Sequence, residues 1–163
     1  MPDEEKLSSY LSKSKLISNS NYAKKIRIAI LGGFTLNGLE ETMRVKCDEK
    51  KIQCTTYVSG YNQYNQEILD EKSQLYKFSP DITFLIIDCR NIFGELFLNP
   101  YSLSAEERKQ FVQTKSDEII NLAKALVKKS NSKLILSNFS IPSYSPIGIN
   151  ETREEFGLHD MVR

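Results

Sequence analysis

The sequence predicts an α/β protein of three layers, in which helices cover both faces of a parallel, flavodoxin-like sheet. Four short apolar runs alternate with stretches of helical periodicity, which is typical of strands joined by right-handed crossovers. Three of these runs are almost continuously apolar, as expected for strands covered on both faces. A glycine-containing loop, residues 32–38, directly follows the first run and marks the carboxyl edge of the sheet.

The four predicted strands cover residues 25–31, 52–58, 81–88 and 133–137. A flavodoxin-like order of 2-1-3-4 would open a crevice between strands one and three. Because a doubly wound domain usually has a fifth strand, we expect the chain to be the front part of a longer domain. We therefore divide it into an amphipathic helix with a polar linker, residues 1–25, and an α/β domain, residues 26–163, truncated at its C-terminus.

Apolar residues at helical spacing predict three helices between the strands. The first begins with Asn37 and Glu40 as a capping pair, and the second covers residues 64–78. The third begins at the capping box formed by Ser104 and Glu107.

Composition excludes several classes of partner. The 163 residues carry a net charge of +1, which gives no electrostatic reason to expect nucleic acid or an anionic membrane as a partner. The apolar runs have the length of strands and are too short to span a bilayer. No apolar export signal is visible, and three cysteines without a Cys-x-x-Cys pair favour a reducing cytoplasm. Cys47 and Cys54 look structural, and Cys89 is expected to be a small buried apolar residue.

Four loops should meet at the carboxyl edge of the sheet. They offer amides, hydroxyls and an Asp/Arg pair, which suits hydrogen bonding to an oxygen-rich ligand. The binding candidates are Gly33, Asn37, Gly60, Tyr61, Asn62, Asp88, Arg90, Asn91 and Asn138. No His, Cys and Asp set has metal-ligand spacing, so we predict no metal and no cofactor in this segment.

Several of these features also have a purely structural interpretation. The glycines of the loop can simply make the turn, and Thr35 can be a helix-start hydroxyl. As a nucleophile, Thr35 would need a base, and His159, the only histidine, is expected at the surface. Asp88 and Arg90 can form a structural ion pair. The tyrosine and amide cluster at residues 61–66 can recognise a ligand or partner, or can start a helix that packs on the sheet.

Neither a Gly-x-Gly-x-x-Gly motif nor a Walker A lysine is present, so the sequence does not favour a dinucleotide or P-loop site.

Four segments taken together resemble the N-terminal region of FkbH-like proteins. They are residues 28–35 (IAILGGFT), 61–64 (YNQY), 75–81 (LYKFSPD) and 88–91 (DCRN).

The resemblance implies a flavodoxin-like domain similar to SGNH hydrolases, followed by a phosphatase-type domain of HAD subfamily IIIC. Characterised members of this family load a glyceryl unit from 1,3-bisphosphoglycerate onto an acyl carrier protein for polyketide assembly. Other members are found in surface polysaccharide or secondary-metabolite clusters. Their HAD domain uses Mg²⁺ and an Asp-x-Asp-x-Thr motif, which is absent here and expected beyond Arg163.

Within the resemblance, Thr35 takes the place of the SGNH serine nucleophile and Phe34 that of the neighbouring aspartate. Gly60 and Asn91 fall near the two blocks that donate to the oxyanion. The Asp-x-x-His block that supplies the base is absent. The resemblance therefore implies an oxyanion-binding pocket of Thr35, Gly60 and Asn91 more than an esterase.

Three functions follow as hypotheses. The first is a domain that binds an acyl or glyceryl group, or the carrier-protein arm, for transfer by a HAD-type enzyme. The second is a non-catalytic interaction module that uses the cluster at residues 61–66. The third is a free-standing esterase with Thr35 as its nucleophile.

Overall fold

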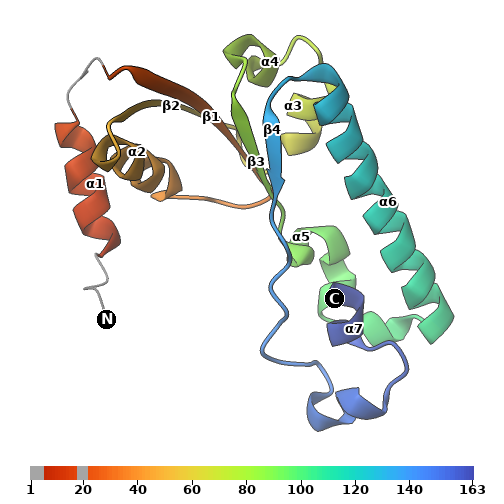
Figure 1. Cartoon of the computed structure of the whole chain (residues 1–163). Coiled ribbons are helices and arrows are strands. Elements are labelled where there is room, and N and C mark those ends of the chain that lie inside the picture. The colour runs from red at the N-terminus through yellow and green to blue at the C-terminus, as the bar shows by residue number, and fades with distance from the viewer. Residues whose placement is uncertain (1–5, 18–21) are drawn as a thin grey trace.

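A computed structural model describes residues 6–17 and 22–163. A four-stranded, all-parallel sheet lies at the centre of the fold, in the order β2-β1-β3-β4 (Figure 1). The strands are β1 (Lys24–Gly32), β2 (Ile52–Val58), β3 (Ile82–Ile86) and β4 (Lys133–Leu136). The predicted fold class and strand order are confirmed, and each strand lies within two residues of its predicted ends.

Helices flank the sheet on both sides (Figure 1). Helix α1 (Leu7–Leu16) packs on α2 (Leu39–Glu49), which packs against β2. The other face is covered by α3 (Tyr64–Leu69), α4 (Gln74–Phe78) and the long α6 (Ala105–Lys129). The main core lies on this second face and contains Ala29, Leu31, Tyr64, Ile68, Leu75, Leu85, Ile87 and Leu126.

Helix α1 occupies part of the predicted N-terminal segment, while the polar linker predicted around Ser18–Asn21 falls outside the described residues. The division of the chain after residue 25 stays a prediction. None of the helices formed by the described residues has the length and apolar character that crossing a bilayer requires.

The single helix predicted over residues 64–78 is wrong, because the chain turns between α3 and α4. The carboxylate of Asp70 accepts from the backbone of Lys72 at 2.9 Å, which closes this turn. The carboxylate of Glu67, on α3, accepts from the backbone N–H of Leu75 at 2.9 Å. A side chain of α3 therefore satisfies a backbone donor in the first turn of α4.

The predicted Asn37–Glu40 capping pair is also wrong. Helix α2 begins after Gly38, whose φ of 83° lies in the left-handed region that glycine adopts without strain. The carboxylate of Glu40 instead accepts from Thr56 Oγ1 on β2 at 2.6 Å. The capping box of α6 is confirmed, because Ser104 and Glu107 exchange both hydrogen bonds.

A second core holds the C-terminal segment against the middle of the chain. Helix α7 (Leu158–Val162) packs on α5 (Cys89–Phe93), and short 3-10 turns at Gly94–Phe97, Pro100–Ser102 and Gly148–Arg153 join the neighbouring segments. The members of this core are Cys89, Phe93, Phe97, Leu158, Met161 and Val162.

Two buried charged residues hold this segment in place. The guanidinium of Arg108, on α6, donates to the carbonyls of Leu103, Glu155 and Phe156 at 2.5–2.8 Å. The carboxylate of Glu151 accepts from Tyr101, Ser145 and the backbone of His159.

Substitution of Arg108 should release the C-terminal segment. We expect Arg108→Met to lower the free energy of unfolding by about 2–4 kcal/mol, because three partly buried hydrogen bonds from a buried guanidinium to backbone carbonyls are lost. Amide exchange in residues 155–163 should accelerate more than exchange in β1. The matched control is Lys109→Met, which removes only exposed ion pairs with Glu106 and Glu155 and should cost much less. Equal effects of the two variants would contradict this role of Arg108.

Glu151 should make the stability of this segment depend on pH. Burial raises the pKa of its carboxyl, but the hydroxyls of Ser145 and Tyr101 and the backbone of His159 outweigh burial, so the pKa lies below its ordinary 4.5. A carboxyl with a lowered folded-state pKa stabilises fully above the unfolded-state pKa, and the stabilisation is lost as pH falls through the folded-state value. We therefore expect Glu151→Gln to be less stable than the parent at neutral pH, and the difference to shrink below pH 4.5.

Urea unfolding at several pH values measures this difference, with exposed Glu154→Gln as the control. A stability gap for Glu151→Gln that stays constant down to low pH would show that the carboxylate charge is not what holds the segment.

Candidate functional site

The loops that follow β1 and β3 meet at the carboxyl edge of the sheet. The backbone N–H of Gly33 donates to the carbonyl of Ile86 at 3.0 Å, and the side-chain amide of Asn91 donates to the carbonyl of Gly33. A Cβ atom on Gly33 would lie 3.2 Å from the Asn91 amide nitrogen, so glycine permits this close approach. One N–H of Asn91 is therefore used within the protein.

A pocket of about 490 Å³ lies between α1 and the loop 32–38, and we call it the β1–β2 pocket. Three of the predicted site residues, Thr35, Asn37 and Tyr61, line it. Ser59, at the end of β2, also lines it, and its hydroxyl is buried without a hydrogen-bond partner among the described residues. Such a hydroxyl is costly unless a ligand or water meets it.

A second pocket, of about 440 Å³, lies on the other side of Phe34, and we call it the β3–β4 pocket. Asp88, Arg90 and Asn138 line it. Ser137, at the end of β4, lines it too, and in the described part of the chain its buried hydroxyl likewise has no partner. The side chain of Phe34 lines both pockets and so forms the ridge between them.

Asp88 and Arg90 have separate roles in the structure. The carboxylate of Asp88 accepts from the backbone N–H of Arg90 at 2.8 Å and so caps α5. The guanidinium of Arg90 lies over the ring of Phe97, 5.4 Å from its centroid. The described residues thus show no ion pair between the side chains of Asp88 and Arg90, so the interpretation of the two as a structural ion pair is wrong.

Asn62 and Asn91 line a third pocket, of about 530 Å³, between α3 and α6. Gly60 lies in the turn after β2 against the side chain of Gln63, outside the lining of these three pockets. Thr35 and Asn91 therefore line different pockets, and the three residues expected to bind an oxyanion are not gathered in one of them.

The tyrosine cluster divides between surface and core. Tyr61 is 67% exposed beside the β1–β2 pocket, whereas Tyr64 is only 9% exposed and belongs to the main core. Tyr64 thus follows the interpretation of a helix start that packs on the sheet, whereas recognition of a ligand or partner by Tyr61 stays a prediction.

Thr35 is exposed and has no histidine in its pocket. His159 lies in α7, where its Nε2 atom is buried without a partner among the described residues, a more enclosed position than the surface one expected.

Burial, and then the Asp88 carboxyl, raise the pKa of the Cys89 thiol. Burial, and then Cys47, raise the pKa of Cys54 to about 12. Neither thiol has the lowered pKa of a nucleophile.

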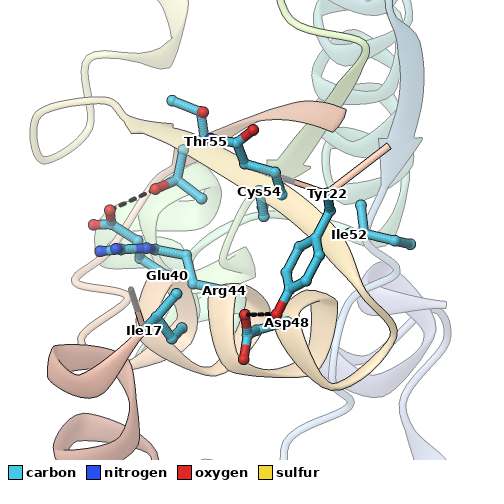
Figure 2. Close-up of a pocket in the computed structure, with 10 residues that line it drawn as sticks. Ile17, Tyr22, Glu40, Arg44, Asp48, Ile52, Cys54 and Thr55 are labelled. Atoms are coloured by element: carbon cyan, nitrogen blue, oxygen red, sulfur yellow. Dashed lines mark hydrogen bonds between the residues drawn. The ribbon is translucent and has the colours of Figure 1, made fainter. Parts of the chain in front are cut away.

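Figure 2 shows a further pocket, of about 320 Å³, between α2 and β2. Tyr22 donates to Asp48 at 3.0 Å, and Thr56 donates to Glu40, so its polar side chains bond one another across the gap. None of the predicted site residues lines it, and we regard it as part of the packing of α2 on the sheet.

Sequence reasoning missed two components of the carboxyl-edge site. No motif in the sequence of α1 predicts that this helix lines the β1–β2 pocket. Its apolar stripe indicated only that the helix packs against another part of the molecule. The hydroxyls of Ser59 and Ser137 directly follow predicted strands, which was the signal that could have found them. In residues 6–17 and 22–163, no group of three or more His, Cys, Asp or Glu side chains is placed to hold a metal ion.

Comparison with known proteins identifies a family and one similar structure. Residues 27–143 match the model of the family described as FkbH, N-terminal domain. The crystal structure of the N-terminal part of the protein BF1531 from Bacteroides fragilis, containing a phosphatase domain complexed with Mg, is similar with a TM-score of 0.72 and 16% identity. The similarity covers 97% of this chain and 39% of that one, so this chain spans well under half of its length. No curated protein matches the sequence significantly.

The two tyrosines should respond differently to truncation. We expect Tyr64→Ala to lower the free energy of unfolding by about 3 kcal/mol, because it leaves a cavity in the main core. Tyr61→Ala should change it by no more than about 0.5 kcal/mol, since that side chain is mostly exposed. Chemical denaturation of both variants measures the contrast, and similar losses for both would contradict the division of the cluster.

Proposed function

Because the chain belongs to the FkbH N-terminal domain family, we propose that it binds an acyl or glyceryl group, or the carrier-protein arm that bears it, at the carboxyl edge of the sheet. It does so in support of acyl transfer whose chemistry takes place on a HAD-type domain. The SGNH-like carboxyl edge would thus serve as a binding site.

The observation that carries this proposal is the pair of unpartnered hydroxyls, one on each side of Phe34. Ser59 and Ser137 are positioned by the ends of β2 and β4, and each lines a pocket large enough for a small ligand. Thioester and ester oxygens accept hydrogen bonds from hydroxyls of this kind. An acyl group on a carrier arm offers these oxygens without a charge.

Binding without cleavage is supported by what surrounds Thr35. Serine-type nucleophiles are activated by a base within hydrogen-bond reach. The resemblance implies that Thr35 takes the place of the SGNH serine, but no histidine lines its pocket. Mg²⁺ is expected only with a HAD domain, and the described residues hold no fitting acidic cluster, so we assign no metal-dependent step to this segment.

Acetyl-pantetheine, a short acyl thioester on the carrier arm, tests the proposal. We expect saturable binding in a calorimetric titration and no thioester cleavage above the buffer rate. Ser59→Ala or Ser137→Ala should weaken binding about 5- to 10-fold, the usual worth of one hydrogen bond from a desolvated hydroxyl. Ser116→Ala, on α6 and outside both pockets, is the matched control.

Absence of binding would overturn the proposal. Cleavage that disappears in Thr35→Ala would overturn it in favour of the esterase hypothesis. Loss of binding in Ser116→Ala to the same extent as in the other serine variants would remove the assignment to the two pockets.

A further inference from the structure

Exposed apolar side chains gather around one pocket of the molecule. Those of Leu7, Leu11, Phe34, Val58 and Tyr61 are each between 36% and 67% exposed, and all five line the β1–β2 pocket. Single exposed apolar residues are ordinary on a protein surface, but a cluster around a hollow marks a binding site.

Helix α1 forms one wall of this pocket and is firmly placed. The side chain of Leu7 fills the space that a Cβ atom on Gly38 would need, so helix and loop are in direct contact. The ammonium of Lys46, on α2, lies 5.1 Å from the ring centroid of Tyr10 on α1. Helix α1 precedes residues 27–143, so this wall of the pocket lies outside the segment that matches the family model.

The polar groups of the pocket select against negative charge. Glu40 and Glu41 line it, and among the described residues no lysine or arginine does. The carboxylate of Glu40 is already bonded to Thr56, so a phosphate or carboxylate entering the pocket would meet the carboxylate of Glu41 and no cationic side chain in the lining. The unpartnered hydroxyl of Ser59 offers a hydrogen bond to a neutral oxygen instead.

We propose that the β1–β2 pocket binds the apolar chain of an uncharged acyl group, and that α1 makes the site prefer chains of several carbons over short or anionic groups. This inference rests on the proposed function and deepens it by naming the acyl class. The volume of about 490 Å³ is within the range of small-molecule pockets, which favours an acyl chain over a docked protein.

Calorimetric titration of the 163-residue chain with octanoyl-pantetheine and acetyl-pantetheine tests the preference. We expect the octanoyl compound to bind at least about 10-fold more tightly, because each buried methylene contributes to affinity. Methyl octanoate carries the same acyl chain without the pantetheine arm. If it binds as tightly as octanoyl-pantetheine, the natural ligand is a free ester. If it binds more weakly, the natural ligand is an acyl thioester on the carrier arm. We expect 3-phosphoglycerate to bind more weakly than acetyl-pantetheine in this pocket, and Glu41→Gln to narrow that gap.

Leu11→Ser should abolish most of the octanoyl preference while leaving acetyl-pantetheine binding in place. Leu16→Ser is the matched control, because it makes the same change on the same helix, at a residue 81% exposed and outside the pocket. Tyr61→Ala gives a second variant on the opposite wall, where loss of folding is not expected. Circular dichroism of each variant checks that α1 remains helical.

Equal affinity for the two thioesters, or an octanoyl preference that survives both Leu11→Ser and Tyr61→Ala, would overturn the inference and leave the proposed function intact. Failure of both thioesters to bind would overturn the proposed function as well. Self-association of the chain that Leu11→Ser abolishes and Leu16→Ser does not would assign the apolar cluster to a protein contact and overturn the inference.

Discussion

The close approach of two loops at Gly33 is the constraint on which the candidate site depends. The backbone of Gly33 bonds to Ile86 at the end of β3, and the Asn91 side chain closes onto the Gly33 carbonyl. These contacts join the two central strands just beyond the sheet, where a side chain on Gly33 would crowd Asn91. Phe34 directly follows this fixed glycine and lines the pockets on both sides.

The strands and their order could be predicted because buried parallel strands have a nearly continuous apolar sequence that depends little on partners. The break between α3 and α4 could not, because it rests on Glu67 and Asp70 bonding to backbone groups that any helix would otherwise use. The start of α2 was misplaced for a similar reason. Asn37 has the right side chain for a cap, but Gly38 takes the left-handed conformation and lets Leu7 pack against the loop.

The sequence predicted which loops meet at the site, but it did not predict which pocket each side chain lines. The strand order predicts that the loops after β1 and β3 face one another, and in the structure Gly33 and Asn91 meet there. Which pocket each side chain enters depends on Phe34, a single ring whose direction no sequence pattern fixes. The enclosed position of His159 has the same kind of origin, because it depends on long-range bonds from Arg108 and Glu151 that hold α7 in place.

The correspondence with SGNH hydrolases that the resemblance implies stays a prediction, and under it Phe34 would stand in place of a carboxylate. No histidine lines the pocket of Thr35. Under this correspondence, both features would remove a group that cleavage needs, and the ring of Phe34 would add apolar surface for binding. Charged side chains line both pockets, with Glu40 and Glu41 in one and Asp88 and Arg90 in the other. Under the proposed function, a ligand that lies across Phe34 would place its neutral apolar end on the α1 side. Any anionic part would lie in the β3–β4 pocket, where the guanidinium of Arg90 can meet it and the carboxylate of Asp88 already caps α5.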